Sequence, residues 1–120
     1  MAELVPEEQF QAFRGHAHVG PIQMLNLLRV RDGGRESYQR YVEECKPLVE
    51  KRGGRILYRA QGRITLIGPD SWDEVILVMY PSRVAFIDMV ESDEYKAVRN
   101  YRQDAIQDSR LDMTTELSIP

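Results

Sequence analysis

The feature that most constrains the fold is a central segment that is apolar at every position. The run Val75-Ile76-Leu77-Val78-Met79-Tyr80 has the length of one strand and ends at Pro81. A strand with one face in water alternates apolar and polar residues, so an unbroken apolar run predicts a strand buried on both faces. The segment from Pro21 to Leu28 also carries apolar residues at both parities. The chain therefore needs cover on both sides of its central strands.

Around these strands the spacing of apolar residues predicts helices and further strands. Apolar residues recur at helical spacing over 38–49 and over 85–106. Ser82 is suited to N-cap the start of the second region, and Ser92 to N-cap a new helix within it. The pattern predicts a β-hairpin over 55–67, around Gln61-Gly62, and a last strand over 111–117. Residues 6–13 predict a short helix ahead of the first strand, and Gly15 can end it.

The predicted order is β-α-β-β-α-β, the ferredoxin-like arrangement of an α+β fold. In this topology both helical regions cover the same face of a four-stranded antiparallel sheet. The other face of the doubly apolar strands then lacks cover, and a chain of 120 residues has no spare element for it. Packing sheet to sheet against a second copy solves this, so the pattern predicts a homodimer. We expect one domain over 20–120 and an N-terminal helical extension over 1–19.

Composition narrows the classes of function. The net charge is −3 and no basic tail is present, which argues against a nucleic-acid partner. No apolar run approaches the ~20 residues of a membrane span, and the N-terminus is acidic where a signal peptide would be basic. The single cysteine, Cys45, excludes an internal disulfide. We therefore expect a cytoplasmic protein with neither nucleic acid nor membrane as partner.

Metal and nucleophile chemistry have little support in the sequence. His16 and His18 lie two residues apart, but a catalytic zinc needs about three protein ligands, and no further histidine joins them. Cys45 lies on the apolar side of a predicted helix, where a thiol is usually an inert small hydrophobe. A G-x-S-x-G turn, typical of serine hydrolases, is absent from the sequence. We expect no metal, no haem and no other cofactor.

Several residues are polar where the pattern calls for apolar side chains. Asn26 interrupts the first strand, and a buried amide without partners costs roughly 1–3 kcal/mol. Arg102 shares a helical stripe with Tyr95, where a guanidinium needs a carboxylate or an acidic ligand. A few polar groups on an apolar wall are the usual form of a small-molecule site. The candidate substrate-binding residues are Asn26, Arg59, Trp72, Tyr80, Tyr95, Arg102 and Asp108.

Two functions remain open at this point. In the first, a small acidic or carbonyl-containing metabolite binds between sheet and helices, held by Arg102 and oriented by Tyr80 or Asn26. If such a protein is a cofactor-independent enzyme, Asp73 or Asp108 would have to serve as its base. In the second, the chain is a non-catalytic homodimeric structural or regulatory module, in which Arg102 pairs with an aspartate and locks its helix to the sheet. The aspartates considered for this pair are Asp73, Asp104 and Asp108.

Several motifs also resemble a known family. They are Asn26-Leu27-Leu28, Tyr38-x-x-Tyr41, Pro47-Leu48 with Gly53-Gly54-Arg55, Trp72-Asp73-Glu74-Val75, Tyr80-Pro81-Ser82-Arg83 with Phe86, and Glu94-Tyr95 with Arg102. Over residues 20–117 they are similar to the bacterial domain-of-unknown-function family 1330, which belongs to the dimeric α/β-barrel superfamily. The resemblance implies the fold and a dimer. The superfamily includes cofactor-free monooxygenases, lactone isomerases and haem-dependent enzymes, so the resemblance does not choose a reaction.

Overall fold

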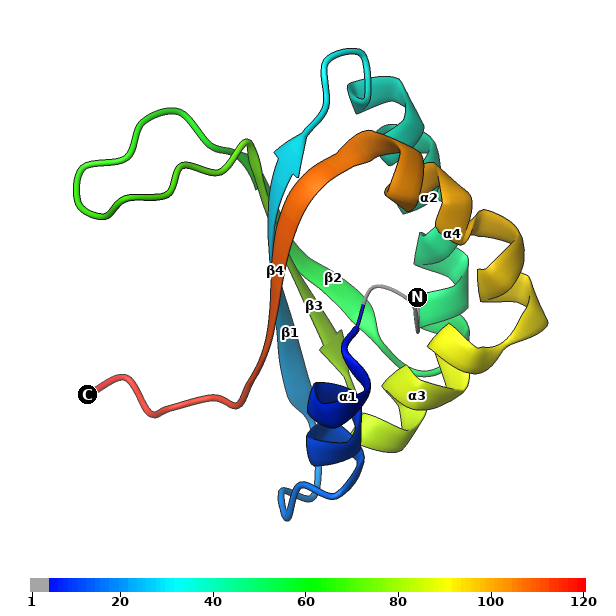
Figure 1. The fold of residues 1–120 in the computed structure, drawn as a ribbon. Helices are drawn as coiled ribbons and strands as arrows, with labels where there is room; N and C mark the ends of the chain where they lie inside the picture. Colours follow the sequence, from blue (N-terminus) through cyan, green and yellow to red (C-terminus); the bar gives the residue numbers. More distant parts are fainter. Residues whose placement is uncertain (1–4) are drawn as a thin grey trace.

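The computed structural model describes residues 5–120, and its four strands form one antiparallel sheet. The strands lie in the order β2-β3-β1-β4, and the main helices cover one face of the sheet (Figure 1). This is the predicted ferredoxin-like α+β fold, which is confirmed. In chain order the elements are α1 (Glu7–Arg14), β1 (Ile22–Val30), α2 (Arg35–Lys51), β2 (Arg55–Gln61), β3 (Glu74–Tyr80), α3 (Arg83–Glu91), α4 (Asp93–Ala105) and β4 (Ile106–Thr114).

The register of the central strands decides which side chains face the helices. Met24 of β1 pairs with Val78 of β3, and Asn26 pairs with Ile76. Because side chains alternate along a strand, the even-numbered positions of both strands face the helices and the odd-numbered ones face the opposite side. In β3 the even positions are buried and the odd positions, such as Leu77, are half-buried. Both faces are therefore apolar, as predicted, but the chain covers only one of them fully.

Capping residues set the boundaries of the helices above the sheet. The Ser82 side chain accepts a hydrogen bond from the Ala85 N–H at 3.1 Å, and that of Ser92 accepts one from the Tyr95 N–H at 3.1 Å. Both are the N-caps predicted from the sequence. Gly53 follows α2 with φ of +82°, a conformation that glycine adopts without strain. These ends fix which turn of each helix lies over the sheet.

The second half of the predicted hairpin is wrong. Residues 63–67 form no strand: β2 ends at Gln61, β3 starts at Glu74, and 62–73 is a loop. At the base of this loop the Gly62 N–H donates to the Asp73 carbonyl oxygen at 2.8 Å, and Gln61 pairs with Glu74. The chain thus returns directly to β3, and the alternating residues after Arg63 have no strand to pair with.

The predicted boundaries of the last strand are also wrong. β4 begins at Ile106, five residues before the expected start at Leu111, and ends at Thr114. Ile106 was expected on the stripe of α4, but it pairs with Val30 of β1 instead. The residues that follow Ile106 are polar, so the spacing of apolar residues gives no sign of a strand there. An edge strand nevertheless tolerates charged side chains.

The helix α1 is held at one end of the sheet by a few specific contacts. The Phe13 ring meets Phe86 edge-on, with centroids 5.3 Å apart. The Arg83 guanidinium donates to the carbonyl oxygens of Phe13 and His18 at 3.0 and 2.9 Å. The predicted short helix is therefore confirmed, and a phenylalanine pins it to the domain.

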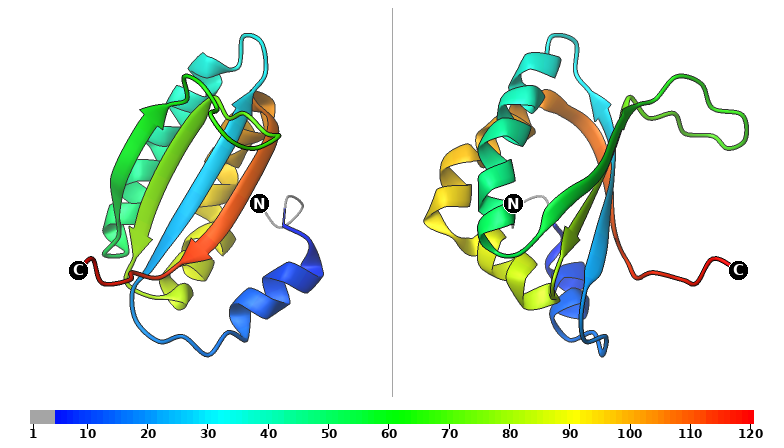
Figure 2. Two further views of the ribbon diagram at one scale, coloured as in Figure 1. Left: turned by 90° about the vertical axis from the view of Figure 1, so that its left-hand side faces the viewer. Right: turned by 180° about the vertical axis from the view of Figure 1, so that it is seen from behind.

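Two segments extend from the sheet face that the helices leave open, which we call the open face. Figure 2 shows the 62–73 loop leaving one end of the strands and residues 115–120 leaving the other. Both segments project on the side opposite to α2, α3 and α4 (Figure 1). The helical side of the sheet therefore carries the core, and the open face lies between two projecting segments.

Candidate functional site

A cavity of about 50 Å³ lies between the sheet and the helices. Helices α2, α3 and α4 supply one wall, and the helix-facing positions of the strands supply the other. A space of this size holds a few water molecules or a small ligand fragment. Its polar lining is made mostly of hydroxyl and thiol groups. The lining side chains that carry a polar group are Asn26, Tyr38, Tyr41, Cys45, Lys46, Tyr80 and Tyr95.

Tyr41 and Tyr95 form the closest polar pair in this lining. Their hydroxyl oxygens are 2.8 Å apart, and their rings meet edge-on with centroids 6.1 Å apart. Tyr80 donates to the Met89 sulfur at 3.6 Å, a weak acceptor. The Asn26 amide reaches two backbone carbonyl oxygens only at 3.5 Å. Tyr80 and Asn26 therefore have only weak partners within the protein, whereas Tyr41 and Tyr95 are bonded to each other.

Burial keeps the acidic groups of the cavity protonated near neutral pH. It raises the pKa of the Cys45 thiol to about 11 and that of Tyr95 to about 12. Burial likewise raises the pKa values of Tyr38, Tyr41 and Tyr80. Within residues 5–120 no carboxylate and no imidazole lines the cavity. The described lining thus offers hydrogen-bond donors but no general base.

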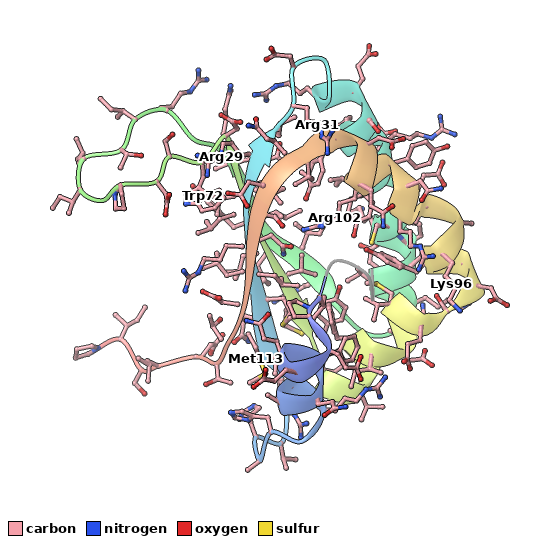
Figure 3. The ribbon with its side chains drawn as sticks, viewed as in Figure 1. Arg29, Arg31, Trp72, Lys96, Arg102 and Met113 are labelled. Atoms are coloured by element: carbon pink, nitrogen blue, oxygen red, sulfur yellow. The ribbon has the colours of Figure 1, made fainter. Side chains whose placement is uncertain are left out.

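Arg102 lies behind this lining, between α4 and the sheet (Figure 3). Only 3% of its surface is exposed. Its positive charge acts on cavity groups from two helices, lowering the pKa values of Tyr41, Cys45 and Tyr95 against the larger effect of burial. It also borders a surface groove of about 510 Å³ at the junction of α4 and β4, which Arg31 shares. Arg102 thus borders the surface groove, and its charge reaches groups of the cavity.

No carboxylate of residues 5–120 forms an ion pair with Arg102. Two of the aspartates considered for this pair have other partners. Asp73 accepts a hydrogen bond from the Val30 N–H at 2.8 Å, and Asp108 pairs with Arg29 at 2.8 Å. A buried guanidinium that lacks a carboxylate keeps a strong preference for an anion or for several acceptors.

Arg59 contrasts with Arg102, because Arg59 forms an ion pair with a carboxylate, that of Glu74. It donates to both carboxylate oxygens of Glu74, at 2.8 and 3.3 Å, and Glu74 is 5% exposed. It also donates to Gln39 at 2.9 Å and lies over the Tyr38 ring at 5.8 Å. The Arg59 guanidinium therefore neutralises a buried glutamate of the fold.

Trp72 and Asp108 lie apart from the cavity. Arg29 joins them: its guanidinium lies 5.1 Å from the centre of the Trp72 ring and donates to Asp108 at 2.8 Å. Figure 3 shows Arg29 and Trp72 together at the base of the 62–73 loop. The hydrogen bond from Arg29 lowers the pKa of Asp108, which makes this aspartate a weak base. Of the seven candidate residues, the structure brings together Asn26, Tyr80 and Tyr95 at the cavity, with Arg102 next to them.

Four polar residues of the lining, Tyr38, Tyr41, Cys45 and Lys46, were not among the candidates. Tyr38, Tyr41 and Cys45 fall on the apolar stripe of α2, where helical spacing indicates core. A signal was available for the tyrosines, because a buried tyrosine hydroxyl needs a partner just as a buried guanidinium does. Applied to α2, that argument would have placed Tyr38 and Tyr41 beside Tyr95.

The histidines do not form a metal centre. His16 accepts a hydrogen bond on Nδ1 from the His18 N–H at 3.0 Å, and the His18 ring lies 3.0 Å from the Pro21 carbonyl oxygen. Throughout the described part of the chain, no three histidine, cysteine, aspartate or glutamate side chains cluster closely enough to hold a metal ion. Within the same residues, no helix combines the length and apolarity needed to cross a membrane.

Residues 24–113 match the family described as Domain of unknown function (DUF1330). The chain belongs to this family. The methylated RPA0582 protein, known from a crystal structure, is 36% identical with a TM-score of 0.88, over 95% of this chain and 93% of that chain. A second crystal structure of RPA0582, from Rhodopseudomonas palustris and described as a protein of unknown function, is 34% identical with a TM-score of 0.88, over 96% of both chains.

More distant structures share the fold. A dimeric ferredoxin-like protein of unknown function from Thermobifida fusca is 12% identical with a TM-score of 0.58, over 82% of this chain and 93% of that chain. At this identity the similarity concerns the fold alone. Among curated protein sequences, none is a match to the chain.

Proposed function

We propose that the chain is a homodimeric protein that binds a small acidic or carbonyl-containing metabolite between its sheet and its helices. Arg102 supplies the positive charge for the anionic end of the ligand. The tyrosine hydroxyls of the cavity, protonated near neutral pH, donate hydrogen bonds to its oxygens. Apolar side chains form the rest of the wall, as in most small-molecule sites.

The observation that carries this proposal is that Arg102 is buried and forms no ion pair with a carboxylate of residues 5–120. Burying a guanidinium without a carboxylate beside it is costly, so a chain keeps one when something else supplies the counter-charge or when binding requires it. Arg59 shows that this fold places a glutamate beside a guanidinium where the structure needs one. Among residues 5–120, Arg102 has no such ion pair, and its charge acts on Tyr41, Cys45 and Tyr95 of the cavity lining. An acidic ligand fits both features.

The lining favours binding over catalysis. A cofactor-independent enzyme needs a base within hydrogen-bond reach of its substrate. The two aspartates considered for this role do not line the cavity: Asp73 is bonded to the Val30 N–H, and Asp108 is paired with Arg29. The alternative of a ligand-free structural module predicts a filled interior, whereas the structure leaves a cavity beside Arg102.

The dimer is supported by the open face of the sheet. Its central residues are apolar and only half-buried in the single chain. A continuous apolar surface of this kind marks an interaction site on a soluble protein. The distant relative from Thermobifida fusca is described as dimeric. The residues at the centre of this face are Leu25, Leu27, Val75, Leu77 and Met79.

The test is a thermal-shift screen with small carboxylates and small ketones, run on the wild-type protein and on Arg102→Met. A ligand at a hundred times its dissociation constant stabilises the folded state by about 2.7 kcal/mol. We expect that stabilisation to disappear in Arg102→Met and to return only in part in Arg102→Lys, because lysine lacks the planar fork that holds a carboxylate. The matched control is Arg40→Met, which removes an exposed arginine of α2 paired with Glu44.

A ligand that stabilises Arg102→Met as much as the wild type would exclude Arg102 as its anchor. A screen in which no small acid or carbonyl compound shifts the wild-type melting temperature would favour the structural module instead.

A further inference from the structure

The 62–73 loop presents a patch of nearly fully exposed apolar side chains. Ile64, Leu66 and Ile67 are 82, 88 and 95% exposed. Single exposed apolar residues are common on protein surfaces, but three within four positions form a patch that calls for a partner. The exposed apolar side chains at its tip are therefore the unusual feature of this loop.

The base of this loop is held firmly against the sheet. The Gly62 N–H donates to the Asp73 carbonyl oxygen, and the Asp73 N–H donates to the Leu28 carbonyl oxygen, both at 2.8 Å. Next to them, Trp72 lies against the Arg29 guanidinium. Beyond this base the loop extends away from the domain on the side of the open face (Figures 1 and 2). The tip is thus directed toward whatever covers that face.

A second segment does the same at the opposite end of the strands. Residues 115–120 follow β4 and project on the same side of the sheet as the loop (Figure 2). They carry Leu117 and Ile119, which are 89 and 94% exposed. The two segments therefore bracket the apolar centre of the open face, one at each end.

We infer that these two segments are arms that clasp a second copy of this chain. The inference rests on the proposed homodimer and goes beyond it, because it assigns contacts outside the sheet faces. Both arms project on the side of the half-buried apolar face, one at each end of its strands, so a second copy that covers this face lies between them (Figure 2). The side chains buried by the clasp are Ile64, Leu66, Ile67, Leu117 and Ile119.

The reach of the loop fits a stacked sheet. Two sheets packed face to face lie ~10 Å apart. The outgoing half of the 62–73 loop has about six residues, which can span up to ~20 Å when extended. A loop extended to this length is long enough to reach past the partner's sheet. In a two-fold dimer the arms of each copy contact the other copy in the same way, so each apolar patch occurs twice in the interface.

The test compares dimer dissociation constants by sedimentation at a series of concentrations. The arm variant is Ile64→Ser with Leu66→Ser and Ile67→Ser. Because these side chains have little contact with their own chain, we expect unchanged far-UV circular dichroism and a dissociation constant at least about 100-fold higher, since six apolar side chains per dimer lose their cover. The control is Val84→Ser on α3, whose side chain is also exposed, at 73%, but lies on the helical side.

Hydrogen exchange of the wild type gives a second, independent measurement. We expect amides of the loop to be protected above the dissociation constant and to exchange freely below it. A dimer whose dissociation constant is unaffected by the arm variant, with loop exchange independent of concentration, would overturn the clasp and leave the sheet-to-sheet dimer standing. A wild-type chain that sediments as a monomer at all concentrations would overturn both.

Discussion

The two faces of the sheet are made from the same strands and the same kinds of side chain, but they end in different environments. On the helical face of β3, Ile76, Val78 and Tyr80 are all less than a tenth exposed. On the open face, Leu77 and Met79 of the same strand are only half-buried. The polarity of the strand does not alternate, although its burial does. Apolar side chains on both faces of β3 are therefore expected in an assembly that covers both faces, and not in a single chain that covers one.

The faces also differ in how their polar groups are satisfied. On the helical face the buried Glu74 carboxylate has a defined partner, the partly exposed Arg59, at 2.8 Å. The open face carries a row of exposed charges on β4, where Arg110 pairs with Asp112 at 3.0 Å. Among the described residues, one buried side-chain atom has no hydrogen-bond partner, Gln23 Oε1. It belongs to the open face, which again points to contacts beyond the single chain.

A charge placed on each face of β3 in turn tests whether the two faces differ in this way. Val78→Asp buries a carboxylate in the apolar interior under the helices, and we expect it to unfold the chain, at a cost above about 4 kcal/mol. Leu77→Asp places the same charge one residue away on the open face. We expect that variant to remain folded and to become monomeric. Circular dichroism and sedimentation measure the two effects separately.

The opposite result would be informative. If Leu77→Asp unfolded the chain as Val78→Asp does, the open face would be part of the core of a single copy. If Leu77→Asp stayed dimeric, the dimer would use another surface.

The second test compares the two buried or partly buried arginines. Removing Arg59 leaves Glu74 buried without its counter-charge, and we expect Arg59→Ala to lose about 3–5 kcal/mol of stability. Arg102→Met removes a guanidinium that has no carboxylate partner among residues 5–120, so we expect a loss below about 1 kcal/mol in the ligand-free protein. Denaturant unfolding measures both. A loss for Arg102→Met as large as that for Arg59→Ala would assign Arg102 to the fold and not to a ligand.

Much of the fold could be predicted because several signals agreed. Helical spacing, the serine caps at Ser82 and Ser92, and the apolar run of β3 each indicated the same order of elements. The two errors have one cause. Residues 63–67 alternate like a strand but have no partner, and the first residues of β4 are polar although they do have one. Pairing is a property of the whole sheet, and the alternation of a short segment does not report it.

The candidate site was predictable only in part. Asn26 and Arg102 were found because a polar group on an apolar stripe demands a partner. Arg59 and Asp108 obey the same argument, but their partners, Glu74 and Arg29, come from residues distant in sequence. A single sequence shows that such a side chain needs a partner without showing which one it has. That difference separates Arg59 from Arg102, and it required the structure.

The third prediction concerns alkaline pH and the helical face. Burial raises the pKa of Cys45 from about 9 in the unfolded chain to about 11 in the folded one. Below pH 9 both states keep the proton, and the stability linked to Cys45 is fully present. As the pH rises toward 11 the unfolded chain loses its proton first, so up to about 3 kcal/mol of stability is lost. Denaturant midpoints from pH 8 to 11 should fall less steeply in Cys45→Ala than in the wild type.

Because Cys45→Ala also removes packing volume, the slopes with pH are compared and not the absolute stabilities. Tyr95, with its pKa raised to about 12, adds a later loss that both proteins share. Equal slopes in the two proteins between pH 9 and 11 would contradict the buried, protonated thiol.

The smallest expected effect tests the unsatisfied atom of the open face. Gln23→Met replaces the amide with an apolar side chain of similar length. In the single chain this removes an unpaired acceptor, so we expect monomer stability to stay equal or to rise by up to about 1 kcal/mol. If the partner copy donates a hydrogen bond to Gln23 Oε1, the same change should weaken the dimer several-fold. Stability measured below the dimer dissociation constant, together with sedimentation above it, separates these two contributions. A variant that is both more stable and more tightly dimeric would show that Gln23 has no partner across the interface.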